Sequence, residues 1–208
     1  MMSAMEPVVP LILSTGWAAG VNAYATVALL CVAGRADLLE LPAAFARTDV
    51  LVASLVLFAV ELVADKVPLL DSGWDVVQTV ARPLIGGTTG ALLAGTDGAD
   101  ALLQTAAAGG SGALSLASHS VKASIRLAVN TSPEPLSNVL VSTAEDAAVA
   151  LVVMLATKHP WAAAAIAMTL LVLGTLLAVV LAKKARAGLR RVRQRQRGRA
   201  QRGPPGAA

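Results

Sequence analysis

Ionisable side chains interrupt several long apolar segments of this chain, and their spacing places them on shared helix faces. Glu61 and Asp65 are four residues apart in one segment, while Lys122 and Arg126 are four apart in another, with His119 one turn earlier. Residues three or four apart lie on the same face of a helix. The sequence therefore predicts an acidic stripe on one helix and a basic stripe on another, which can neutralise each other inside a bundle.

Two more apolar segments carry ionisable groups of both signs. Arg82 follows Gln78 by four residues in the first of them, and adjacent acids occupy the second. A charged side chain at the centre of a membrane helix costs about 2.5–3.5 kcal/mol, so such groups need partners or water. We expect seven residues to line or lock a polar centre between these four segments: Glu61, Asp65, Arg82, Lys122, Arg126, Glu145 and Asp146.

Two interpretations of this polar centre follow from the residues. A water-filled centre can carry an ion, a proton or a small anion, whereas a dry centre consists of structural ion pairs. Lys66, Asp71 and Asp75 lie nearer the ends of their segments, where side chains can reach the lipid headgroups.

Signatures of enzymes are missing from the sequence. The two histidines, His119 and His159, are too far apart in the chain to predict a metal site. Ser118 and Ser120 flank His119, but adjacent positions on a helix point away from each other and do not make a triad. No glycine-rich phosphate-binding loop is present. We therefore predict a protein that is not an enzyme, with no catalytic residues, no metal and no cofactor.

Composition and charge distribution point to the lipid bilayer. Hydrophobic residues make up 56% of the 208 residues and charged residues only 14%, whereas soluble domains carry about 25%. Residues 160–182 carry no charge, and ten basic residues follow before residue 203, so the rest of the chain has a net charge of −6. Basic residues beside a membrane span stay on the cytoplasmic side. We expect a membrane domain over residues 1–182 and a disordered cytoplasmic tail over residues 183–208.

The basic tail has an expected partner. Each basic residue near an acidic leaflet contributes about 1 kcal/mol to binding, which makes anionic lipid a nearer partner than nucleic acid. The residues that we expect to face lipid are Lys183, Lys184, Arg186, Arg190 and Arg191.

The apolar segments predict an all-α, polytopic membrane helix bundle with about six transmembrane helices. The expected spans are residues 8–34, 50–64, 76–94, 101–129, 139–156 and 160–182. Counting back from a cytoplasmic C-terminus places the N-terminus on the cytoplasmic side as well.

Polar, proline-containing connections separate the second span from the third and the fourth from the fifth, at Pro68 and at Pro133 and Pro135. This echo suggests an internal repeat. Helices broken at matching places are typical of transport sites. The alternative is two ordinary helical hairpins with similar turn chemistry.

Small residues occur at the spacing for close helix contact in lipid. Gly16 and Gly20 in the first span, and Gly86 and Gly90 in the third, are four residues apart. This spacing predicts close packing between helices and is also compatible with a homo-oligomer. Asn22 is expected to hydrogen-bond across helices.

Several of these motifs resemble those of an uncharacterised bacterial membrane family known only as a domain of unknown function, the 4126 family. The resemblance rests on three stretches, which are residues 20–24, residues 61–83 and residues 130–146, and it covers about residues 14–156. It implies a protein of the bacterial inner membrane and carries no established activity, substrate or functional residue.

Three functions are consistent with the sequence. The first is a small transporter or channel-like permease for an ion or a small polar solute, with the polar centre as its pathway. The second is a membrane scaffold or assembly factor, in which the charges are structural and the basic tail recruits lipid or a cytoplasmic partner. A third, a lipid-handling protein, would need a groove that opens sideways to the bilayer.

Overall fold

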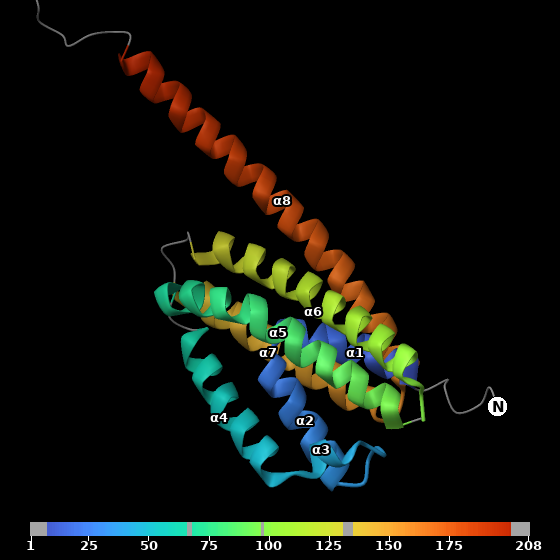
Figure 1. Ribbon diagram of the computed structural model, residues 1–208. Coiled ribbons are helices and arrows are strands. Elements are labelled where there is room, and N and C mark those ends of the chain that lie inside the picture. Colours follow the sequence, from blue (N-terminus) through green and yellow to red (C-terminus); the bar gives the residue numbers. More distant parts are fainter. Residues whose placement is uncertain (1–7, 66–67, 97, 131–134, 201–208) are drawn as a thin grey trace, which may run out of the picture.

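The computed structural model describes residues 8–65, 68–96, 98–130 and 135–200, and this part of the chain is entirely helical apart from its connections. The predicted all-α class is confirmed. The described residues form eight helices and no strand: α1 (Val8–Val21), α2 (Ala23–Arg35), α3 (Ala43–Ala46), α4 (Thr48–Ala64), α5 (Pro68–Thr96), α6 (Ala101–Asn130), α7 (Pro135–Ala156) and α8 (Pro160–Ala200). Figure 1 shows their arrangement.

The first apolar segment is broken, so the prediction of one continuous helix over residues 8–34 was wrong. Asn22 has an extended backbone (φ −150°, ψ 100°) and caps α2, because its side-chain oxygen accepts a hydrogen bond from the Ala25 amide at 2.9 Å. Asparagine is among the most favourable N-cap residues. The sequence around Asn22 is apolar on both sides, so hydropathy alone does not reveal the break.

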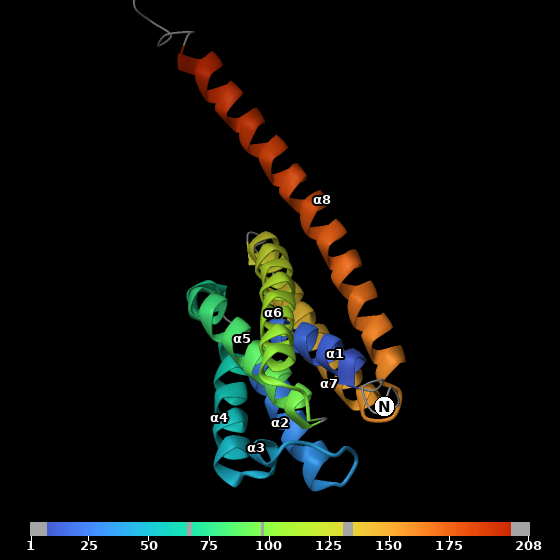
Figure 2. The same cartoon turned by 45° about the vertical axis from the view of Figure 1, so that its right-hand side comes forward.

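Helices α5 and α6 form a long antiparallel pair with the most extensive contact between any two helices of the described structure (Figure 1). Helix α1 packs against both members of this pair, while α2 packs against α4 and α7. Helix α8 contacts α1, α6 and α7 near its start and then extends away from the bundle, as Figures 1 and 2 both show.

The predicted glycines make the close helix contacts expected of them. Hydroxyl groups of α6 fill the space beside each glycine and bond across the contact, as with Ser111, whose Oγ donates to the Gly86 carbonyl at 2.8 Å. A Cβ atom placed at Gly20 would lie 2.2 Å from the Ser115 carbonyl oxygen, and one at Gly90 would lie 2.5 Å from the Ser111 Cβ. Gly16 and Gly86 face the same stripe of serines. These helices therefore approach each other so closely that only glycine fits.

The two proline-containing connections coincide with helix starts. Pro68 is the first residue of α5 and Pro135 is the first residue of α7. Proline is favoured at the first position of a helix, because the N–H group that it lacks would have no acceptor within the helix. Pro133 lies outside the described residues. Within the described residues, the break that falls inside a predicted span is at Asn22.

Two of the described helices are long and apolar enough to cross a membrane, namely Val139–Ala156 in α7 and the 25-residue stretch Pro160–Lys184 in α8. α1 and α2 are apolar but shorter. Large hydrophobic side chains are exposed on α4, α5 and α8, with Val76 73% and Leu84 65% exposed.

The tail that we expected to be disordered from residue 183 is helical as far as Ala200, where α8 ends. This prediction was wrong for residues 183–200. The stretch is rich in Arg, with several Ala, Lys and Gln, all of which favour helix, and the next proline comes only at residue 204. Residues 201–208 lie outside the described part.

Replacement of a contact glycine tests the packing. Gly20→Ala should destabilise the protein by about 1–3 kcal/mol, because the new methyl group would collide with the backbone of α6. The measurement is the thermal unfolding midpoint of the purified protein in detergent. Gly109→Ala is the matched control, because nothing lies within 4 Å of its added Cβ. Equal shifts in both variants would contradict close packing at Gly20.

Candidate functional site: a buried network of charges

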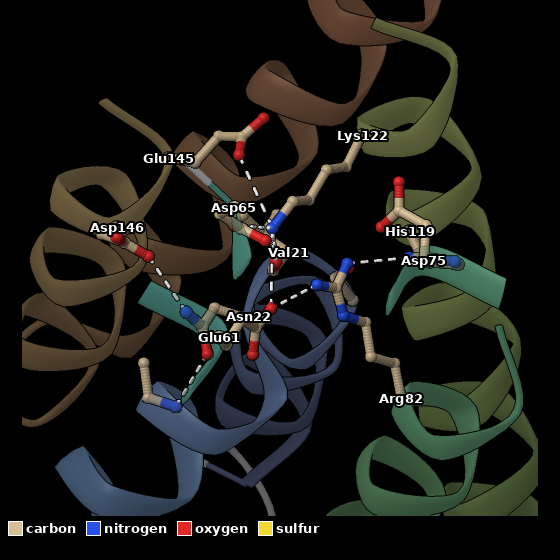
Figure 3. A network of polar contacts seen from close by, with 12 residues as sticks. Val21, Asn22, Glu61, Asp65, Asp75, Arg82, His119, Lys122, Glu145 and Asp146 are labelled. Carbon is tan, nitrogen blue, oxygen red and sulfur yellow. Dashed lines mark hydrogen bonds and ion pairs between the residues drawn. The ribbon is translucent and has the colours of Figure 1, made fainter. Parts of the chain in front are cut away.

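The guanidinium of Arg82 stands at the meeting point of four helices. Its Nη2 pairs with the Glu61 carboxylate from α4. Its Nη1 donates to the Gly20 carbonyl oxygen at the end of α1, at 3.0 Å, and faces His119 Nδ1 of α6 at 2.7 Å (Figure 3). One cationic group therefore joins α1, α4, α5 and α6.

The contacts of His119 define its tautomer. Arginine only donates hydrogen bonds, so Nδ1 of His119 accepts from Arg82 and the ring is neutral with its proton on Nε2. Nε2 lies 3.1 Å from the Thr79 hydroxyl oxygen, and that hydroxyl itself donates to the Asp75 carbonyl at 2.9 Å. His119 therefore adds no charge to the network. Its ring links the Arg82 guanidinium to the Thr79 hydroxyl, both of which belong to α5.

The ammonium of Lys122 lies in a cage of oxygen atoms. It donates to the Val21 carbonyl at 3.0 Å and to Asp65 Oδ2 at 2.8 Å. Carboxylate oxygens of Glu61 and Glu145 are each 3.6 Å away. The oxygens come from α1, α4 and α7, so Lys122 holds these three helices to α6.

The guanidinium of Arg126 continues the network one turn further along α6. It donates to the Asp65 carbonyl at 2.8 Å and to Asp65 Oδ2 at 3.1 Å. On its other side, it donates to Glu145 Oε2 at 2.6 Å. Asp65 is thus shared between Lys122 and Arg126, and Glu145 brings α7 into the same cluster.

Asn22 links the break in the first segment to α7. While its side-chain oxygen caps α2, its amide nitrogen donates to Asp146 Oδ1 at 3.0 Å (Figure 3). The expected hydrogen bond across helices is confirmed. Both ends of one amide are used, one to shape the backbone and one to attach it to the bundle.

The break also turns the end of α1 toward the cations. The carbonyls of Gly20 and Val21 belong to its last turn, where carbonyl groups lack partners within the helix. This end of a helix carries partial negative charge. Arg82 and Lys122 each donate to one of these carbonyls, so side chains supply the hydrogen bonds that a continued helix would have supplied.

The network is almost completely buried and balanced in charge. Arg82 and Glu61 are 0% exposed, and the side chain of Glu145 is the most accessible member at 16%. Three cationic side chains contact three carboxylates in this part of the described structure: Arg82, Lys122, Arg126, Glu61, Asp65 and Glu145. A fourth carboxylate, Asp146, is half-buried beside the network and hydrogen-bonds to Asn22.

Three buried groups near Arg82 carry polar atoms that have no hydrogen-bond partner among the described residues. These atoms are Glu61 Oε2, Arg82 Nε and both amide atoms of Gln78, whose side chain is fully buried one turn before Arg82 on α5. Such atoms are rare in native proteins, since leaving one unpaired costs about 1–3 kcal/mol. Around Arg82, the network therefore contains buried polar atoms for which the described residues supply no hydrogen-bond partner.

Six of the seven ionisable residues predicted from the sequence meet in this one buried cluster, and the seventh, Asp146, lies beside it as the partner of Asn22. The sequence-based set omitted His119 and Gln78, although their spacing from Lys122 and Arg82 already placed them on the same helix faces. It also omitted the Gly20 and Val21 carbonyls, which have no side-chain signal. No group of three or more His, Cys, Asp or Glu residues in the described ranges could hold a metal ion. Of the basic tail, Lys183, Lys184 and Arg186 are exposed, while the side chains of Arg190 and Arg191 lie outside the described set.

Two substitutions at Asn22 separate its two roles. Serine and aspartate cap helices about as well as asparagine, so the cap alone predicts similar stability for Asn22→Ser and Asn22→Asp. Because Asp146 lies 3.0 Å from the Asn22 amide nitrogen, the aspartate would set two carboxylates against each other. We expect Asn22→Asp to be less stable than Asn22→Ser by about 1–3 kcal/mol in thermal unfolding. Equal midpoints would contradict the bond to Asp146.

Comparison with known proteins identifies the family. Neither the curated proteins nor the solved structures compared with the chain contain a match. A family model described as a domain of unknown function, DUF4126, matches residues 9–180, which include every residue of the charge network. This chain therefore belongs to the DUF4126 family of domains of unknown function.

Proposed function

We propose that this protein is a small permease for an ion or a small polar solute in the cytoplasmic membrane of a bacterium, with its C-terminus in the cytoplasm. In this proposal, α1 and α2 together make the first of six crossings, and α4, α5, α6, α7 and α8 make the others. The distribution of side chains supports a lipid environment. Large hydrophobic residues such as Val76 and Leu84 point outward while Arg82 and Glu61 are buried, the reverse of the usual order in a soluble protein.

The observation that carries this proposal is the helix broken at Asn22 beside the buried charges. Interrupted helices whose freed carbonyls face cations are the usual construction of transport sites near the middle of a membrane. Here the Gly20 and Val21 carbonyls face Arg82 and Lys122. Ionisable residues inside a membrane are costly and usually belong to a pathway for ions or protons.

Within this proposal, the oxygen cage around Lys122 is the place where a transported cation binds. Its ammonium is surrounded by one backbone carbonyl and carboxylate oxygens of three residues, which is a set of ligands that also suits a free monovalent cation. A tethered ammonium in such a cage can exchange with a transported cation or release a proton. The unpartnered amide of Gln78, one turn before Arg82 on α5, supports a polar solute on the Arg82 side of the network.

A specific observation favours the second candidate, a membrane scaffold or assembly factor. The network is closed, since its members other than Glu145 are nearly inaccessible, and its charges are balanced. A dry cluster of opposite charges that neutralise each other can serve only to hold helices together. In a permease, the same arrangement corresponds to an occluded state.

Flux measurements on neutralised variants distinguish the two. The full chain is reconstituted in liposomes, and gradients of H⁺, Na⁺, K⁺ and Cl⁻ are imposed in turn while internal dyes report each ion. We expect the unmodified protein to move at least one of these ions. Glu61→Gln should abolish the flux and should also lower the unfolding midpoint, because it leaves Arg82 buried without its carboxylate. The cost of such a broken pair is about 3–5 kcal/mol.

The double variant Glu61→Gln with Arg82→Gln is the matched control. It removes both charges together, so much of the lost stability should return while the flux stays absent. If a folded double variant still moved the ion, the network would serve only to hold the helices together. Absence of flux of all four ions through the unmodified protein would contradict an ion permease.

Truncation after residue 182 tests the scaffold. A permease whose pathway lies in the bundle should keep more than half of its flux without the basic part of α8, whereas a scaffold that recruits partners through that part should lose its role. Loss of flux in a truncated protein that still unfolds at the normal temperature would count against the permease.

A further inference from the structure

A groove opens on the side of the bundle between α6, α7 and α8. Its volume is about 420 Å³, and its walls are mainly apolar, including Val121 and Ile125 from α6, Ala144 from α7, and Leu173 and Leu177 from α8. Lys122 and Glu145 are its charged lining residues, and both are already paired in the buried network. A ligand in this groove therefore meets hydrocarbon and no unpaired charge.

Helix α8 touches α6 within the groove and separates from the bundle further along. The contact is at Gly174, since a Cβ atom placed there would lie 2.8 Å from Val121 Cγ1. Beyond this contact α8 leaves the bundle, as seen in both Figures 1 and 2. Leu173 and Leu177 are 57% and 48% exposed, so the groove is open to the surroundings along α8.

A basic residue continues the face of α8 that lines the groove. Lys184 lies two helical turns after Leu177 and three after Leu173, so these three residues form one stripe along α8. Lys183 also has an exposed side chain but is rotated by about 100° around the helix from Lys184. No acid occurs between residues 183 and 202 to neutralise this end of α8.

The length of this stripe matches one leaflet of a bilayer. At 1.5 Å per residue, the rise from Leu173 to Lys184 is about 16 Å. Half of the hydrocarbon core of a bilayer is about 15 Å. A lipid whose headgroup lies at Lys184 would therefore lay its acyl chain along Leu177 and Leu173 and end near the Gly174 contact.

We propose that the groove between α6, α7 and α8 is a binding site for a single anionic phospholipid, with the headgroup on Lys184 and an acyl chain in the groove. The ligand is anionic because positive charge is found where the headgroup would lie. It is a lipid because the walls are apolar and open sideways. The site is independent of the permease proposal, since a scaffold could bind lipid in the same way.

Titration of lipid into the detergent-purified full chain tests this site. Native mass spectrometry would count bound lipid, and the unfolding midpoint would be followed in parallel with phosphatidylglycerol and with phosphatidylcholine of the same chain length. We expect one phosphatidylglycerol to bind more tightly and to raise the midpoint more. Lys184→Ala should weaken its binding about fivefold, as expected for the loss of about 1 kcal/mol from one basic residue.

Two other variants complete the experiment. Lys183→Ala is the matched control, because it removes the same charge from another face of α8, and it should leave binding of the tight lipid nearly unchanged. Ala144→Trp should fill the groove and abolish the one-to-one complex without touching a basic residue. The site would be overturned by equal binding of the two lipids, by equal losses in the two lysine variants, or by unchanged binding to Ala144→Trp.

Discussion

The fold depends on neutralising charge in an apolar interior, and the break at Asn22 is what makes this possible. Three cationic side chains are buried with three carboxylates, yet carboxylates alone leave several N–H donors of Arg82 and Lys122 without acceptors. The end of α1 supplies the remaining acceptors through the Gly20 and Val21 carbonyls. A continuous helix would use those carbonyls internally. The interruption of the first segment and the burial of the charges therefore require each other.

Small residues determine how near the charges can come. Arginine and lysine reach the end of α1 only because α1, α5 and α6 touch at Gly20, Gly86 and Gly90, where a single methyl group would collide with the neighbouring helix. The serines of α6 add hydrogen bonds at the same contacts, among them the bond from Ser115 Oγ to the Arg82 carbonyl at 2.9 Å. The same contacts between α1, α5 and α6 therefore provide both the close packing and the polar centre. This is why a helix bundle with few aromatic residues can still hold a defined charged site.

The network joins parts of the molecule that would have to move in transport. Asn22 is attached to α7 through Asp146, while α1 is attached to α5 and α6 through Arg82 and Lys122. Any motion of the broken helix therefore exchanges partners among charged groups and cannot occur independently of them. The same bonds, left undisturbed, would make a rigid scaffold. The groove beside α8 lies next to this cluster and shares Val21, Lys122 and Glu145 with it.

Local periodicity in the sequence was enough to predict the helical class, the helix faces and the signs of charge on each face. Glu61 with Asp65, and Lys122 with Arg126, could be grouped because a spacing of four residues has the same meaning in any helix. The break at Asn22 could not be predicted, since an asparagine in an apolar run is compatible with either a continuous or an interrupted helix. Nor could the partners of Arg82 and Lys122, because backbone carbonyls have no signature in the sequence. Only the tertiary structure decided these, since they depend on which helix ends meet in space, and that is set by packing between residues more than 60 positions apart.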